Sequence, residues 1–299
     1  MGSNPTPRTS DVIRLSLVTE HSLFLLREGY RESTIWSRVS SLKSLARKAD
    51  LKDPEAVKAA ISQLNCSEGR KEILVTTCRL FCSQFEIPFT RPRYQRVETL
   101  PFIPLEVEVD QLIAGMGKRH ATYLQFLKET GARAGEAWNA KWTDINIDSV
   151  AIRPEKSSRP RMLKLSNALL SMINRLPRGS EFVFGGGDLE YFSRWFYVKR
   201  KEIAEKLGNP RIRQIGFKTL RHWKATNLYH RTRDILLVQR VLGHKDIRNT
   251  LVYTHLIDTS NDDYVCKTAG SVEDAKELIE EGFEYVTEYA GVKLFRKRK

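Results

Sequence analysis

A proline-rich segment limits the folds that this sequence can adopt. Residues 86–106, EIPFTRPRYQRVETLPFIPLE, contain four prolines and show no helical periodicity. Because proline lacks a backbone N–H and clashes with the preceding turn, no regular helix can run through this stretch. The segment therefore predicts an extended linker. The chain has 299 residues, which is enough for a domain on each side.

The residues before the linker predict a small helical domain. Apolar residues recur at three- and four-residue steps in four segments: residues 22–30, 33–49, 53–64 and 69–85. Ser33 and Asp53 are the expected N-caps of the second and third helices. Three basic side chains on the second helix could face a polyanion or form an ordinary solvated face: Arg38, Lys43 and Arg47.

The residues after the linker predict a mostly helical domain with a small sheet. Helical periodicity dominates from residue 105 to about residue 256, interrupted by two short alternating segments, INIDSVAIRP and RMLKLS, that predict strands around a polar turn. Beyond them, Ser271 and Asp274 resemble a capping box, and residues 283–299 predict a hairpin. This tail could pack on its own core or on a neighbouring molecule. The predicted fold class is mainly α with a small β-sheet.

The charge balance indicates a polyanionic partner. The chain carries 50 Lys and Arg against 36 Asp and Glu, a formal net charge of +14. This excess favours nucleic acid over an acidic membrane, although solubility alone is an alternative. No apolar run approaches the roughly 18 residues that span a bilayer, and the first residues lack a signal-peptide pattern. We therefore expect a cytoplasmic protein without a membrane partner.

Metal and nucleotide sites have no support in the sequence. The four cysteines form no CxxC pair or Cys/His cluster, and the six histidines show no ligand spacing. The chain contains neither GxxxxGK[ST] nor GxGxxG. We expect chemistry that needs no metal and no cofactor.

Basic residues recur at spacings that suit a phosphate. In KTLRH, Lys218 and Arg221 lie three apart and share one helix face, while His222 is turned by roughly 100°. In TGARAGE, Arg133 stands at a helix start, where Glu136 one turn on could hold its guanidinium. The alternatives are a solvated face for the first pair and a structural ion pair for the second.

Two further features could belong to the same site. Lys156 lies in the turn between the predicted strands, where it could reach a substrate or be a plain turn lysine. In VLGHKDIRNTLVYTHL, residues 241–256, His244 precedes Tyr253 by nine residues. The tyrosine could be an ordinary core aromatic. Alternatively, the phenol could attack a phosphodiester, which requires a cationic pocket or a base because its pKa is about 10.

Taken together, these stretches resemble the boxes of the tyrosine recombinase family, the integrases and Xer-type recombinases. TGARAGE is similar to the TGLRxxE box, KTLRH to the HxLRH box, and LGHKDIRNTLVYTH to the LGH box followed by TxxxY(T/S)H. Order and spacing agree over about residues 105–257. The resemblance implies a helical core-binding (SAM-like) domain at residues 1–88, a linker at 89–104, a catalytic domain at 105–257 and a C-terminal tail at 258–299.

The resemblance also implies roles for six catalytic residues and one supporting residue. Arg133 and Arg221 would clamp the scissile phosphate, with Glu136 in support, and Tyr253 would attack phosphorus. Lys156 would be the general acid for the departing 5′ oxygen, and His244 would hydrogen-bond the phosphate or the nucleophile. Lys218 departs from the usual histidine and is similar to the KxxR variant of archaeal integrases, which leaves the general base open between Lys218 and none.

The expected function is therefore site-specific recombination of double-stranded DNA through a 3′-phosphotyrosine intermediate and a Holliday junction. The expected assembly is a homo-tetramer on DNA, with a monomer in solution left open. Six residues of the first domain and the linker are the expected DNA contacts: Arg38, Lys43, Arg47, Arg91, Arg93 and Arg96. A type IB topoisomerase and a catalytically silent DNA-binding relative are the alternatives. Whether Tyr253 acts in its own subunit's pocket or a neighbour's also stays open.

Overall fold

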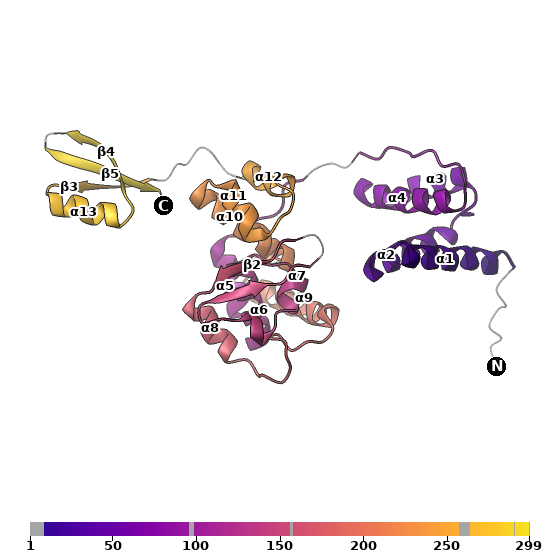
Figure 1. Ribbon diagram of the computed structural model, residues 1–299, viewed down its shortest axis with the longest axis horizontal. Coiled ribbons are helices and arrows are strands. Elements are labelled where there is room, and N and C mark those ends of the chain that lie inside the picture. Colours follow the sequence, from indigo (N-terminus) through magenta and orange to yellow (C-terminus); the bar gives the residue numbers. More distant parts are fainter. Residues whose placement is uncertain (1–8, 96–98, 156–157, 257–263, 290, 299) are drawn as a thin grey trace. The chain divides into compact units, whose positions relative to one another are not determined.

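The computed structural model describes residues 9–95, 99–155, 158–256, 264–289 and 291–298 (Figure 1). Two compact units make up the chain, Met1–Thr99 and Leu100–Lys299. The described residues are mainly helical and the sheets are small, which confirms the predicted fold class. Among them, every helix is too short or too polar to span a bilayer.

The described part of the first unit consists of four helices. They are α1 (Thr9–Arg27), α2 (Glu32–Ala46), α3 (Pro54–Ser62) and α4 (Glu68–Gln84). Their apolar faces enclose a common core that includes Leu42, Ile61, Val75 and Phe81. The three- and four-residue spacing of the apolar side chains thus accounts for the bundle.

The two predicted N-caps of this unit have different outcomes. Asp53 caps α3 as predicted, because its carboxylate accepts hydrogen bonds from the backbone N–H groups of Glu55 and Ala56 at 3.0 and 3.1 Å. The prediction for Ser33 is wrong. Helix α2 begins at Glu32, and Arg31 supplies the extended backbone of the N-cap without a side-chain hydrogen bond.

Residues 86–95 and 99–105 of the proline-rich segment form neither helix nor strand, as its prolines predict. Its first half lies on the first unit, since Ile87, Phe89 and Tyr94 pack against the core of the four helices. Arg91 forms an ion pair with Glu72 of α4.

The main body of the second unit is a helical domain with one small hairpin. Its helices are α5 (Glu106–Ala114), α6 (Lys118–Thr130), α7 (Ala134–Trp138), α8 (Asn167–Asn174), α9 (Leu189–Lys206), α10 (Phe217–Thr232), α11 (Ile235–Leu242) and α12 (Arg248–Leu251), with single 3₁₀ turns η1 (Trp142–Asp144), η2 (Pro210–Gln214) and η3 (Val252–Leu256). Strands β1 (Ser149–Ile152) and β2 (Arg161–Lys164) pair antiparallel, with Val150 opposite Leu163. This is the hairpin that the alternating segments predict.

Helix α6 lies in the core of this body and connects the core to the start of α7. Tyr123 is fully buried, and its ring meets Phe184, Phe192 and Phe217 edge-on at centroid distances of 5.0 to 5.1 Å. Its hydroxyl donates a 2.7 Å hydrogen bond to the carbonyl of Ala134, the first residue of α7. Aromatic packing therefore fixes the turn that presents Arg133.

A separate small core lies at the C-terminal end. Strands β3 (Tyr264–Ala269), β4 (Glu284–Tyr289) and β5 (Val292–Arg298) form an antiparallel sheet in the order β3-β5-β4, and helix α13 (Val272–Glu280) follows β3. The capping box of Ser271 and Asp274 and the β4–β5 hairpin are both present, as predicted. Strand β3 is an addition that the sequence pattern missed. Leu278, Phe283 and Phe295 are buried in this core.

Candidate active site

Glu136 connects three of the elements around the candidate site. Its carboxylate, whose side chain is 0% exposed, accepts hydrogen bonds from the backbone N–H and the Nη1 of Arg133 at 2.9 and 3.0 Å. It also accepts from Arg161 Nη2 of β2 at 2.7 Å and from Ser158 Oγ. Burial raises the pKa of Glu136, but the bonds from Arg161, Ser158 and Arg133 outweigh this effect and lower the pKa to about 2. The carboxylate is thus ionised and holds two guanidinium groups in place.

Arg221 of α10 ties together two turns that are far apart in the sequence. Its Nη1 donates to the carbonyl of Gly131 at 2.6 Å, and its Nη2 donates to the carbonyl of Leu242 at 2.8 Å. The residue is 6% exposed. Burial, followed by the charges of Arg133 and Arg161, lowers the pKa of Arg221 to about 10, so the side chain still carries its charge at neutral pH. Three guanidinium groups therefore surround one carboxylate, which leaves an excess of positive charge.

His244 lies in the turn between α11 and α12. Gly243 ends α11 with a left-handed φ of 68°, and its carbonyl accepts a 2.9 Å hydrogen bond from the N–H of Arg159. The Nδ1 of His244 lies 2.9 Å from Thr250 Oγ1, and the residue is 8% exposed. Burial, and then the charges of the three site arginines, lower the pKa of His244 to about 4. Its imidazole is therefore neutral at pH 7.

Tyr253 lies in η3 and is 2% exposed. Its hydroxyl is 3.0 Å from the Nδ1 of His222, which belongs to α10, and α10 packs against η3. Burial raises the pKa of the Tyr253 phenol, while the charges of Arg221 and Arg133 act in the opposite direction. The phenol is thus protonated at neutral pH and lies within the electrostatic field of Arg221 and Arg133.

Lys218 and Lys156 are not among the buried residues that the structure describes at this site. Lys218 is exposed in the first turn of α10, and its charge contributes to lowering the pKa of His222. Lys156 lies outside the described residues. Ser158, which is described and follows it in the hairpin loop, pairs with His244 in an isolated β-bridge. The structure therefore gathers Arg133, Glu136, Arg221, His244 and Tyr253.

Four residues of this site were missed by sequence reasoning: Ser158, Arg161, His222 and Thr250. Ser158, Arg161 and His222 act through contacts with side chains 22 to 31 residues away, which local spacing does not show. Thr250 contacts His244 in the adjoining turn. His222 had one signal, namely that its side chain is turned away from the face of Lys218 and Arg221. That rotation directs it to Tyr253.

Four of the six predicted DNA contacts are exposed in the first unit: Lys43, Arg47, Arg91 and Arg93. Arg38 is partly buried, with its guanidinium 4.6 Å from the ring centre of Tyr30. Arg91 pairs with Glu72, and Arg96 lies outside the described residues.

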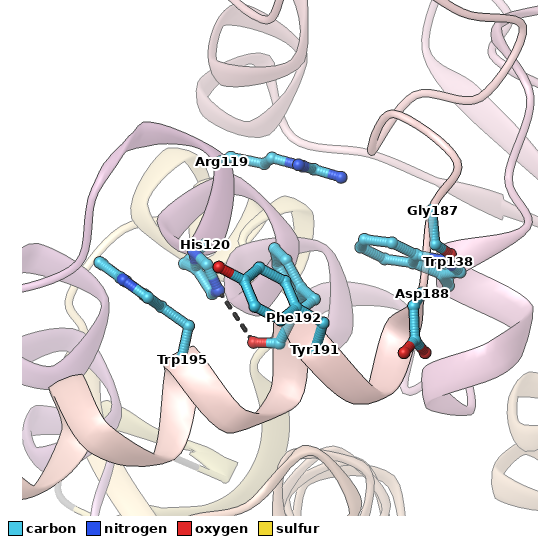
Figure 2. A pocket seen from close by; sticks show the side chains of 8 residues that line it. All are labelled: Arg119, His120, Trp138, Gly187, Asp188, Tyr191, Phe192 and Trp195. Carbon is cyan, nitrogen blue, oxygen red and sulfur yellow. Dashed lines mark hydrogen bonds between the residues drawn. The ribbon is translucent and has the colours of Figure 1, made fainter.

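A pocket of about 330 Å³ lies elsewhere in the second unit (Figure 2). It is lined by Arg119, His120, Trp138, Gly187, Asp188, Tyr191, Phe192 and Trp195. Several of its polar side chains already have partners within the fold. Arg119 donates to the carbonyl of Phe184, Asp188 caps α9, and the ring of His120 stacks on Phe192 at 3.8 Å. None of the predicted catalytic residues that the structure describes lines this pocket, so it is distinct from the site of Arg133, Arg221 and Tyr253.

Several curated tyrosine recombinases and integrases are similar to this chain in sequence. A tyrosine recombinase, XerA, of Saccharolobus solfataricus is 26% identical over 176 residues, which cover 57% of this chain and 56% of that protein. The integrase of Escherichia phage P2 is 28% identical over 192 residues, which cover 64% of this chain and 53% of the integrase. A tyrosine recombinase of Thermosipho africanus is 29% identical over 199 residues, which cover 61% of this chain and 68% of that recombinase. The chain thus spans little more than half the length of the first two.

Solved structures share the fold. A lambda integrase (75–356) dimer bound to a COC′ core site has a TM-score of 0.65 and 16% identity, with 83% of this chain and 97% of that chain covered. The XerH recombinase bound to its difH substrate has a TM-score of 0.57 and 16% identity, with 85% and 88% covered. Residues 105–260, just over half of the chain, match the model of the phage integrase family. The chain therefore belongs to the phage integrase family.

Proposed function

We propose that this protein is a site-specific DNA recombinase that breaks and rejoins DNA through Tyr253. The observation that carries the proposal is the burial of the Tyr253 phenol within the field of Arg133 and Arg221. A buried hydroxyl in the field of an excess of guanidinium charge suits a reaction in which the phenol meets an anion. A phosphodiester is such an anion, and bidentate guanidinium contacts fit its nonbridging oxygens.

The arrangement supports a defined role for each arginine. Arg133 is held by Glu136 and is 30% exposed in its side chain, so it can reach a substrate from solvent. Arg221 is fixed by two carbonyls, and a guanidinium has further N–H donors for phosphate. Because these donors are in place before the substrate arrives, they can stabilise the charge that builds on phosphorus, at roughly 3 to 4 kcal/mol for one such donor.

The proposed reaction proceeds in two transfers. Tyr253 Oη attacks phosphorus, the bond to the 5′ oxygen breaks, and a 3′-phosphotyrosine forms. The 5′ hydroxyl of a second strand then attacks this ester and releases the tyrosine. Lys156 is the proposed acid for the departing 5′ oxygen, and Lys218 is a proposed phosphate ligand. Since the ester retains the phosphodiester energy, rejoining needs no nucleotide cofactor.

The proposed partner is double-stranded DNA, held by both units. The net charge of +14 and the exposed Lys43, Arg47 and Arg93 favour contact with its phosphates. Residues 1–88 would be a DNA-binding domain, 89–104 a linker, 105–257 the catalytic domain and 258–299 a tail. Exchange of two sites would run through a Holliday junction in a tetramer, as a lambda integrase tetramer has been solved on a Holliday junction.

Capture of a covalent adduct tests this proposal. The protein is incubated with a pool of randomised duplexes that carry a nick, so that a cleaved strand end can diffuse away and the intermediate is trapped. We expect a protein–DNA species that survives denaturation, and we expect its loss in Tyr253→Phe. Tyr229→Phe is the matched control, because Tyr229 packs against the same apolar cluster as Tyr253, which includes Val238 and Leu242. This change also removes only a hydroxyl. An adduct that persists in Tyr253→Phe would remove Tyr253 as the nucleophile.

A further inference from the structure

The contact between His222 and Tyr253 gives the proposed reaction a proton acceptor. We propose that His222 Nδ1 takes the proton from Tyr253 Oη as the phenol attacks phosphorus, so that His222, and not Lys218, is the general base. This inference rests on the proposed function and adds a catalytic residue to it. The two atoms are 3.0 Å apart, which is within the reach that a general base needs.

The chemistry of the neighbouring groups argues against the other candidates for the general base. A protonated lysine or arginine has no lone pair to offer, so neither Lys218 nor the site arginines can accept the proton in their charged forms. His244 has its Nδ1 bonded to Thr250 Oγ1, and among the described residues the Tyr253 phenol hydrogen-bonds to His222 and not to His244. In contrast, a neutral His222 with its proton on Nε2 has a free lone pair on Nδ1 that points to the phenol.

The surroundings keep His222 neutral before the reaction. Burial, followed by the charges of Lys218 and Arg221, lowers the pKa of His222 to about 4. The imidazole is therefore unprotonated at pH 7 and ready to accept. When a phosphodiester binds at the arginines, its negative charge offsets those cations and favours the imidazolium that forms during attack.

The proton balance of both transfers is closed. During cleavage, the Oη–H bond breaks and its proton moves to Nδ1, the Oη–P bond forms, and the 5′ oxygen leaves with a proton from a separate acid, the role proposed for Lys156. During rejoining, the incoming 5′ hydroxyl gives its proton to that same group. His222 then returns its proton to the departing phenol oxygen of Tyr253. No oxidant, metal or cofactor takes part in these steps.

Substitution of His222 tests the proposal with a duplex recovered from the randomised pool by the wild-type protein. Asn places an amide near the position of Nδ1 and keeps a hydrogen bond, but it cannot take a proton. We expect single-turnover cleavage by His222→Asn to be about 10²-fold slower or more, the usual contribution of a general base. The matched control is His230→Asn, the same change at an exposed position of the same helix, which should cleave at the wild-type rate.

A DNA substrate with sulfur in place of the 5′ bridging oxygen distinguishes the loss of a general base from the loss of a general acid. With sulfur in the 5′ bridging position, the leaving group departs without a proton, so loss of a general acid is compensated. The His222→Asn defect should persist on this substrate. Restoration of the rate by sulfur would place His222 on the leaving group and overturn the proposal.

The dependence of the cleavage rate on pH tests the role of His222 independently. The groups whose charges act on His222 or on the phenol are Lys218, Arg221 and Arg133, and all are cations at neutral pH. Without a base, attack depends on the tyrosinate fraction. The His222→Asn rate should therefore rise about tenfold for each pH unit between pH 6 and 8. The wild-type rate should change much less, because the pKa values of both His222 and His244 lie near 4.

Nitrogen NMR of histidine-labelled wild-type protein tests the proposal without any variant. It should show neutral His222 with its proton on Nε2, whereas a proton on Nδ1 would make His222 a donor and overturn the proposal. Cleavage by His222→Asn within threefold of wild type would also overturn it. If wild-type protein captures no DNA at all, the proposed function fails and the inference fails with it. If His222→Asn forms the adduct at an unchanged rate, the inference about His222 fails while the proposed function stands.

Discussion

At the scale of a single residue, the surroundings of Arg221 favour the binding of an anion. Its two hydrogen bonds go to uncharged carbonyls, of Gly131 and Leu242, and its neighbours Arg133 and Arg161 are also cations. A buried guanidinium with its pKa lowered in this way is unfavourable for the folded protein alone. In the proposed function, a bound phosphate would offset this cost, and an ionisable group perturbed in this way is a candidate for a functional site.

The two positions of the KTLRH box should respond differently to substitution. Arg221→Ala should lower adduct formation by about 10²-fold or more, because it removes a fixed donor at phosphorus. Lys218→His should retain measurable cleavage, since it keeps a donor at the exposed start of α10. Single-turnover rates on one duplex provide the measurement. If Lys218→Ala cleaves at the wild-type rate, Lys218 has no part in the chemistry.

At the scale of elements, Glu136 joins helix α7, strand β2 and the hairpin loop. Arg133, Arg161 and Ser158 all donate to its buried carboxylate. This network fixes how the hairpin meets the helix start, and thus where the guanidinium groups lie.

Glu136→Gln should reveal the strength of this junction. It leaves the buried Arg161 and its neighbour Arg133 without their carboxylate, and breaking a buried pair in this way costs about 3 to 5 kcal/mol. We expect a decrease of this size in the free energy of unfolding, measured with denaturant at pH 7. Glu181→Gln is the control, because its ion pair with Lys141 is exposed and should contribute less than about 1 kcal/mol. Equal effects of the two changes would contradict the role of Glu136.

The contrast between Arg133 and His222 shows what sequence reasoning can reach. Arg133 and Glu136 are three residues apart, so helix geometry alone predicts their contact. His222 and Tyr253 are 31 residues apart, and Arg161 and Glu136 are 25 apart. Those contacts depend on how α10 packs against η3 and how β2 packs against α7, and no local spacing contains this information. The helical boxes were therefore predictable, while the partner of the phenol was not.

The secondary structure shows the same division between local and tertiary causes. The hairpin of β1 and β2 and the C-terminal capping box follow from alternation and cap residues. Ser33 failed as a cap because the extended backbone at Arg31 already starts the helix two residues earlier. Strand β3 was missed because its identity depends on pairing with β5, which lies beyond α13 in the chain.

At the scale of the whole molecule, the net charge of +14 should determine how DNA binding responds to salt. Each phosphate neutralised contributes about 0.9 to the slope of log affinity against log salt. Replacing both Lys43 and Arg47 by Gln should therefore reduce this slope by about 1.8 if both contact phosphates. Titrations of labelled duplex at several salt concentrations measure it. A flat salt response of the unmodified protein would contradict DNA binding through these charges.

The account depends most on Tyr253, and its linkage to DNA can be determined directly. The trapped adduct is digested with nuclease and trypsin, and the modified peptide is sequenced by mass spectrometry. Cleavage after Arg248 gives a peptide that contains both Tyr253 and Tyr264, so fragmentation distinguishes the two tyrosines. We predict a nucleotide joined through its 3′ phosphate to Tyr253. A nucleotide on Tyr264 or any other residue, or one joined through its 5′ phosphate, would contradict the account.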